Sequence, residues 1–427
     1  MASQIVMAQP AQPSHDPQAS ISIPNFRWQS ADHKLQSKVE TSPTPTPNPP
    51  LGVLSAFSGN FSGTGFNTIF RPNSGPPSGT TFTNAVTPAP PTAPSENVLE
   101  LNLTTETLNF GSALGRVPNR GLGEQSDVFL NGVPYVQSVN DVANLSTGNR
   151  DGAPLGIHFE TGIWMHLPAT TADPPLAASI VRMGSIPHGT TINAQSLEPT
   201  QTFSGPPVIP AVDLTPFVIG SSPPIKIPFA SQTATNASTP RIPQDLSAFI
   251  AAGTITQAIL TDPNTVLRNA NTGKKIIKTE VFTVSTTPSA PELGGGTANI
   301  AFLTGTTSAG PNANAATMTA TFWINTVQST LTIPSGSAPL RVIQTPPPHP
   351  GARVPSFVVP PTANPVGERT ITVTHTEIQY SQTVNLNFAG LTWPHVSVAT
   401  LVPTAELHVV PEHDDGGAAL GPRIVGQ

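Results

Sequence analysis

The sequence predicts an all-β protein built from many short strands, and three observations support this fold class. Apolar and polar residues alternate with the two-residue period of a strand in several segments, most clearly at 378–388. Segments rich in Gly, Pro, Asn and Ser separate these strands. Only one segment, 245–259, has a helical pattern. Short strands with frequent turns are typical of β-barrels and β-sandwiches.

Composition excludes several classes of function. Charged residues make up 10% of the chain, against roughly a quarter in an average soluble domain, and the net charge is −6. Because no basic cluster is present, we expect neither nucleic acid nor a membrane as a partner. The absence of cysteine excludes disulfides and thiolate metal sites. The N-terminal segment lacks an apolar signal-peptide core, so we expect a cytoplasmic protein.

Residues 1–95 are rich in Pro, Ser, Thr and Gly, and we expect them to form an extended arm. Proline fixes φ and removes a backbone donor, so neither a helix nor a central strand is expected there. Scattered apolar residues would anchor the arm on the folded part of the protein. They include Phe26, Trp28, Phe61 and Phe70.

Strand signals follow from residue 96 onward. Asn131 and Gly132 lie between two apolar runs at 127–139, which predicts a tight hairpin turn. Segment 156–167 alternates between an apolar face and a face that carries His158, Glu160, Trp164 and His166. The remaining predicted strands lie within 178–194 (broken at 184–189), at 278–284, 297–303, 317–331 and 340–343, within 369–401 (broken at Gly390), and at 405–410.

Four motifs occur in the order that they have in one family of β-barrels. They are NGVPYVQSV at 131–139, GIHFETGIWM at 156–165, SIPHGTTINAQ at 185–195 and IQYSQTVNLNFAGLTWPHVSVATL at 378–401. Together they resemble the nitrobindin family, which comprises ten-stranded heme-binding β-barrels of the calycin, fatty-acid-binding-protein type. The resemblance covers 96–196 and 366–410. The family's Gly- and Trp-rich opening strand is not recognisable, and 109–123 is a poor substitute for it.

The resemblance also determines the predicted domain organisation. Residues 197–365 interrupt the barrel and carry strands of their own between Pro-rich connectors, which predicts a second β-barrel inserted into the first. The predicted parts are an arm at 1–95, a heme barrel formed by 96–196 and 366–410, an inserted barrel at 197–365 and a tail at 411–427.

The resemblance implies heme b as the cofactor, with His395 as the axial ligand of its iron, because neutral imidazole is a strong iron ligand. His158 would be a distal acid or base that acts on a bound oxidant. The other residues that would contact the heme are His188, Arg182, Met165, Phe388 and Tyr380, with Arg116 as another partner for its propionates. From the residues alone, a hydrogen-bonded strand-end role for His395 and a solvent-facing strand for His158 stay open.

The resemblance implies that the iron reacts with hydrogen peroxide, nitric oxide or peroxynitrite, as in a peroxidase or a peroxynitrite isomerase. Two alternatives stay open. One is a carrier that encloses an apolar small molecule without heme. The other is a self-assembling shell subunit whose N-terminal arm ties neighbouring copies together, and a homo-oligomer fits either hypothesis.

Overall fold

The computed structural model describes residues 47–71, 98–123, 125–170, 175–197, 200–239, 241–287, 294–304, 314–335, 341–359, 367–388 and 391–409. All of them belong to one compact unit that begins at Pro47. This unit is all-β, with 9% helix, which confirms the predicted fold class. None of its helices is long and apolar enough to cross a membrane.

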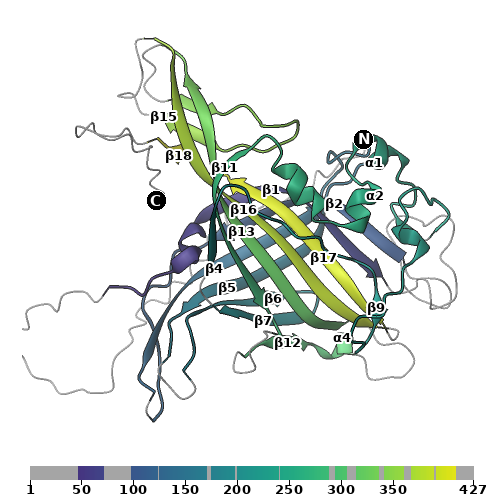
Figure 1. Ribbon diagram of the computed structural model, residues 1–427, viewed down its shortest axis with the longest axis horizontal. Coiled ribbons are helices and arrows are strands. Elements are labelled where there is room, and N and C mark those ends of the chain that lie inside the picture. The colour runs from purple at the N-terminus through teal and green to yellow at the C-terminus, as the bar shows by residue number, and fades with distance from the viewer. Residues whose placement is uncertain are drawn as a thin grey trace, which may run out of the picture. The chain divides into compact units, whose positions relative to one another are not determined.

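Ten antiparallel strands form a closed barrel (Figure 1). In chain order they are β1 (Gly59–Arg71), β2 (Val98–Phe110), β4 (Val128–Asp141), β5 (Leu155–Leu167), β6 (Ser179–Ile186), β7 (Thr190–Leu197), β11 (Lys275–Ser285), β13 (Asn314–Ile333), β16 (Arg369–Phe388) and β17 (Leu391–Pro403). Each of these strands pairs with the next one in this order, and β17 pairs back onto β1. Closure satisfies the backbone groups that an open sheet would leave at its edges.

Short strands extend this barrel. β3 (Val117–Asn119) pairs with β4, β9 (Phe217–Val218) with β17, and β10 (Arg241–Ile242) with β2. β7 and β11 are joined by a single residue pair, Gln195 with Ser285. Two short strands pair with the remaining edges: β8 (Gln201–Ser204) pairs with β11, and β12 (Gly296–Asn299) pairs with β7. A separate three-stranded sheet contains β14 (Arg341–Gln344), β15 (Ser356–Val359) and β18 (Leu407–His408).

The two longest strands that we predicted for an inserted domain belong to this same barrel. β11 and β13 come from the 197–365 region, and they lie between β7 and β16 in the closed sheet. The described residues of that region therefore form no second barrel. A Pro-rich segment such as 197–245 can mark a loop as well as a domain boundary, and here it lies between β7 and β11, which are neighbouring strands of one sheet.

The opening strand of the barrel lies in the segment that we predicted as an extended arm. β1 packs so closely against β17 that a Cβ at Gly63 or Gly65 would collide with a carbonyl oxygen of that strand. Phe61 and Phe70 are buried barrel residues. Residues 1–46, 72–97 and 410–427 lie outside the described residues, and so do the predicted anchors Phe26 and Trp28.

The predicted hairpin turn at Asn131 and Gly132 does not occur, because β4 runs straight through both residues. Gly132 lies opposite Met165, and a Cβ there would collide with the carbonyl oxygen of Trp164. The Asn131 side-chain oxygen accepts hydrogen bonds from the backbone N–H groups of Gly115 (3.0 Å) and Gly132 (2.9 Å). This dipeptide therefore allows close strand packing instead of a turn.

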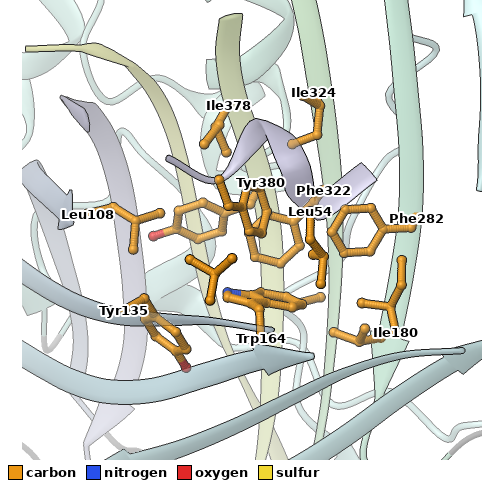
Figure 2. Close-up of a cluster of buried hydrophobic side chains, with 14 of the residues drawn as sticks. Leu54, Leu108, Tyr135, Trp164, Ile180, Phe282, Phe322, Ile324, Ile378 and Tyr380 are labelled. Carbon is orange, nitrogen blue, oxygen red and sulfur yellow. The ribbon is translucent and has the colours of Figure 1, made fainter. Parts of the chain in front are cut away.

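An aromatic core fills one part of the barrel interior (Figure 2). Phe57 follows the 3-10 helix η1 (Gly52–Ala56), and its ring stacks on Phe110 with 4.7 Å between centroids. The same ring meets Trp164 edge-on at 5.4 Å, and Phe282 stacks on Phe322 at 5.5 Å. Such aromatic pairs add roughly 0.5–1.5 kcal/mol each beyond their buried area. The segment at η1 therefore anchors the chain inside the barrel.

Three short helices pack on the outer face of β1, β2 and β17 (Figure 1). They are α1 (Ser247–Ala252), α2 (Gln257–Thr261) and α3 (Thr265–Ala270), which confirms a helical segment at 245–259 and extends it. Phe249 and Leu267 are fully buried against outward-facing strand residues such as Leu101. The predicted strand at 297–303 is shorter than expected, because β12 ends at Asn299 and α4 (Ala301–Thr304) follows.

Candidate functional site

The barrel encloses a cavity of about 470 Å³ beside the aromatic core. Eight-stranded barrels are just wide enough for side chains to fill, so a ten-stranded barrel has room for an internal ligand. The cavity wall mixes apolar side chains with amides and imidazoles. Its apolar residues include Ile69, Val139, Met318, Val384 and Leu386, and its polar residues include Asn67, Asn102, Gln137, His158, Gln382 and His395.

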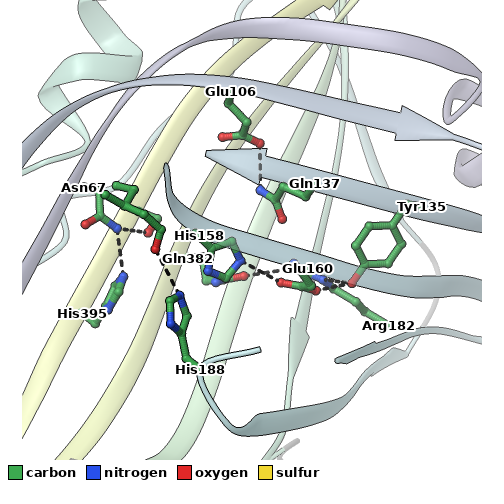
Figure 3. A network of polar contacts seen from close by, with 12 residues as sticks. Asn67, Glu106, Tyr135, Gln137, His158, Glu160, Arg182, His188, Gln382 and His395 are labelled. Atoms are coloured by element: carbon green, nitrogen blue, oxygen red, sulfur yellow. Dashed lines mark hydrogen bonds and ion pairs between the residues drawn. The ribbon is translucent and has the colours of Figure 1, made fainter. Parts of the chain in front are cut away.

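Three histidines from distant parts of the chain reach this cavity (Figure 3). His158 lies on β5, His188 in the turn between β6 and β7, and His395 on β17. The rings of His158 and His188 are 5.6 Å apart between centroids. His188 Nε2 lies 3.1 Å from the carbonyl oxygen of Ile157, to which it donates. The sequence predicted all three as site residues, and the barrel closure brings them to one cavity.

The polar face of β5 points into the barrel. Glu160 and Trp164 are fully buried, and the side chain of His158 is 19% exposed, whereas Phe159 on the opposite face is 43% exposed. A solvent-facing role for this polar face, which the sequence left open, is therefore wrong. The interior position is possible because neighbouring strands supply hydrogen-bond partners for these polar groups.

His395 is held by amide groups on the neighbouring strands. The Asn67 amide nitrogen donates to His395 Nε2 at 2.9 Å and to Ser397 Oγ at 2.7 Å. Asn102 donates to the Asn67 side-chain oxygen at 3.2 Å, which fixes the orientation of that amide. Burial lowers the pKa of His395 to about 3, with smaller contributions from His158 and His188. The ring is therefore neutral, with its proton on Nδ1.

This arrangement does not fit the predicted heme site. An axial histidine needs an imidazole nitrogen with a free lone pair, but Nε2 of His395 accepts a hydrogen bond and Nδ1 carries the proton. Arg182, the predicted propionate partner, donates to buried side chains inside the barrel. Arg116 lies over the ring of Phe129 at 3.4 Å. The side chains as placed therefore leave His395 no free ring nitrogen for the iron.

Arg182 is the centre of a buried polar network (Figure 3). It donates to Glu160 at 2.9 Å, to the Tyr135 hydroxyl at 3.1 Å and to the Gln382 side-chain oxygen at 2.7 Å. Tyr135 also donates to Glu160, and His158 Nε2 lies 3.4 Å from the second oxygen of the same carboxylate. Every polar atom that these contacts involve has a partner, as buried charges require.

Glycines on the neighbouring strands make room for this network. A Cβ at Gly162 would collide with the Tyr135 ring, and a Cβ at Gly184 would collide with a carboxylate oxygen of Glu160. Burial alone would raise the pKa of Glu160, but the charge of Arg182 together with the contacts from His158 and Tyr135 outweighs burial and lowers the pKa to about 2. The Glu160–Arg182 pair is therefore ionised and electrically neutral as a unit.

A second carboxyl group, Glu106, is buried without a cation in contact. Tyr380 donates to one of its oxygens at 2.6 Å, and Gln137 donates to the other at 2.8 Å. Burial raises the pKa of Glu106 to about 7, against the lowering effect of these two hydrogen bonds. Two carboxyl groups in one barrel thus have pKa values on opposite sides of their ordinary value.

The other predicted site residues divide into two groups. Tyr380 lines the cavity, whereas Met165 does not, because it lies on the outer face of β5 opposite Gly132. The side chain of Phe388 lies outside the described part of the chain. The sequence analysis missed Asn67, whose strand lay in the predicted arm, and it missed Gln137 and Gln382, whose polar side chains gave no signal beyond strand alternation. Among the described residues, no group of three or more His, Cys, Asp or Glu side chains is placed to hold a metal ion.

A scan of protein-family models, a search of curated proteins and a search of solved structures found no match for this chain. The resemblance to nitrobindins therefore rests on the sequence motifs alone.

Proposed function

We propose that the protein binds a neutral small molecule inside its barrel. The observation that carries this proposal is the cavity of about 470 Å³, which is lined by the barrel strands and mixes apolar walls with a few fixed polar groups. Small-molecule sites typically have volumes of about 300–1,000 Å³ and the same mixture of surfaces. This is the carrier hypothesis that the sequence left open.

The charges around the cavity favour a neutral ligand. Glu160 and Arg182 neutralise each other, the low pKa of His395 keeps its ring uncharged, and Glu100, which also lines the cavity, has a partner of its own. A charged ligand group buried here would lose its water without gaining an unpaired counter-ion, which costs several kcal/mol. Amide and imidazole groups instead offer hydrogen bonds to a neutral ligand with a hydroxyl, carbonyl or amine group.

The test uses N-phenylnaphthylamine, a neutral fluorophore whose emission rises in apolar sites. Val384 lies between Met318 and His395 in the sheet, and all three line the cavity. We expect saturable binding to the wild type and binding at least about tenfold weaker in Val384→Trp, because the indole would fill the cavity. Val384→Ala should retain binding, and so should Thr319→Trp, which places an indole at an exposed position beside Met318.

Binding to Val384→Trp with the wild-type affinity would contradict the proposal. Hemin titrated under the same conditions separates this proposal from the heme hypothesis. A Soret band that collapses in His395→Ala would support heme ligation and would contradict a neutral-ligand carrier.

A further inference from the structure

One buried guanidinium organises two groups that face the cavity. Arg182 contacts Glu160 at 2.9 Å, and Glu160 in turn contacts His158 at 3.4 Å. Through another nitrogen, Arg182 donates to the side-chain oxygen of Gln382 at 2.7 Å. His158 and Gln382 both line the cavity, whereas Glu160 and Arg182 are buried behind them. If the Arg182–Glu160 ion pair only stabilised the fold, it would not need contacts with His158 and Gln382, which both face the cavity.

The contact between His158 and Glu160 places the imidazole as a base. A carboxylate beside one ring nitrogen holds the proton on that nitrogen and stabilises the imidazolium that forms when the other nitrogen takes a proton. Here Nε2 of His158 faces the carboxylate, so Nδ1 keeps its lone pair. Among the residues that the structure describes, neither His188 nor His395 has a carboxylate partner: His188 donates to a backbone carbonyl, and His395 accepts from Asn67.

Gln382 supplies a complementary donor. Because its oxygen accepts from Arg182, its amide N–H₂ group is the part that can donate to a ligand in the cavity. A donor that is already oriented stabilises negative charge as it develops on a bound molecule, and in a site shielded from water this effect is strong. Arg182 therefore fixes both the base and the donor.

We propose that the cavity catalyses the removal of a proton from carbon on a neutral bound molecule, with His158 as the base. This inference rests on the proposed binding function. The substrate class is a neutral carbon acid, whose C–H is acidified by an adjacent carbonyl or C=N group. His158 takes the proton, the electron pair of the C–H bond moves toward the acidifying group, and Gln382 donates a hydrogen bond to the oxygen or nitrogen atom that receives the negative charge. Glu160 is a positioning residue, because it acts on the substrate only through His158.

Nitrobenzisoxazole is a suitable probe, because it is small, neutral and flat. A base removes its ring C–H proton, the released electron pair completes a nitrile, and the N–O bond breaks to leave a coloured phenolate. No oxidant, reductant or second substrate is needed. We expect saturable elimination by the wild type that is faster than elimination by the same concentration of free imidazole.

Variants of the full chain assign the base. We expect His158→Gln and His158→Asn to lower the elimination rate about 100-fold or more. His188→Asn should lower it far less than His158→Asn, and His408→Asn, the matched control at an exposed position outside the cavity, should leave it unchanged. Gln382→Leu should lower the rate about tenfold or more, because it removes the donor. An equal loss in His188→Asn and His158→Asn would overturn the assignment.

A measurement on the wild type keeps the proposal testable if the variants fold poorly. N-phenylnaphthylamine should inhibit the elimination in proportion to its occupancy of the cavity. Elimination that continues while the fluorophore is bound would place the reaction elsewhere and overturn the proposal. Fluorophore binding without any elimination above the imidazole rate would overturn the catalytic proposal alone, whereas absence of fluorophore binding would contradict the proposed binding function.

Discussion

At the scale of single residues, the interior of this barrel depends on how each buried polar group is paired. Glu160 is ionised because Arg182 lies 2.9 Å away, while Glu106 has only the neutral donors Tyr380 and Gln137. The same side chain thus has a pKa of about 2 in one position and about 7 in the other. Burial raises the pKa of a carboxyl group wherever no cation compensates for it.

Glu106 should make stability depend on pH. Its folded pKa of about 7 lies above the ordinary value of 4.5, so the folded state binds an extra proton between these values. Ionisation of Glu106 therefore lowers the free energy of unfolding as the pH rises from 4.5 through 7. Glu106→Gln removes this titration. The free energy of unfolding of Glu106→Gln should therefore rise relative to that of the wild type between pH 4.5 and 7, by up to about 3 kcal/mol.

Urea unfolding of both proteins at several pH values between 4 and 8 measures this difference. Histidines such as His395 titrate in both proteins and cancel in the comparison. An exposed glutamate, Glu406→Gln, serves as the matched control and should show no such trend. A stability difference between Glu106→Gln and wild type that is constant with pH would show that Glu106 is ionised throughout this range.

The residue types in the sequence were enough to indicate three histidines of the candidate site. His158, His188 and His395 were predictable, because histidine within a strand or turn signal is noticeable in a chain with few charged residues. Their shared cavity depends on contacts between strands that are distant in sequence. Gln382 could not be singled out, because amides are common in this chain and its role depends on Arg182, which is 200 positions away.

At the scale of elements, close strand packing explains both errors of the sequence analysis that involve glycine. The glycines of β1 lie in a Pro- and Ser-rich segment, where they resemble loop residues, although Gly63 and Gly65 lie directly against β17. Gly132 follows Asn131 as in a hairpin turn, although it lies inside β4. Local patterns predicted the strands β5, β6, β7, β13 and β16 well, because alternation is a local signal, whereas close approach between strands is not.

Gly63→Ala should weaken the closure between β1 and β17. The added Cβ would collide with backbone atoms of Thr400, which cannot rotate away as a side chain can. We expect a loss of about 1–3 kcal/mol in the free energy of unfolding, the usual cost of overpacking. The urea midpoint measures this loss.

Gly367→Ala is the matched control, because no atom lies within 4 Å of the position of its added Cβ. It should change the urea midpoint little. Equal midpoints for Gly63→Ala and Gly367→Ala would contradict the close packing of β1 on β17.

At the scale of the whole barrel, one closed sheet unites parts of the chain that the sequence appeared to divide. β11 and β13 complete the wall that β7 and β16 leave open, so the cavity exists only when the predicted insert is present. Residues from both sides contribute to the cavity: Met318 and Leu303 come from the predicted insert, and His158 and His395 from the predicted heme barrel. Closure and strand order depend on pairing over long sequence separations, which alternation does not encode.

The most direct test of the central claim is diffraction from crystals soaked with bromonaphthalene, a neutral molecule whose bromine is located by its anomalous scattering. The account predicts one bromine peak inside the barrel, beside Val384 and Met318, and its loss in Val384→Trp. Peaks only on the outer surface of the barrel, with none among the cavity residues, would contradict a ligand-binding interior.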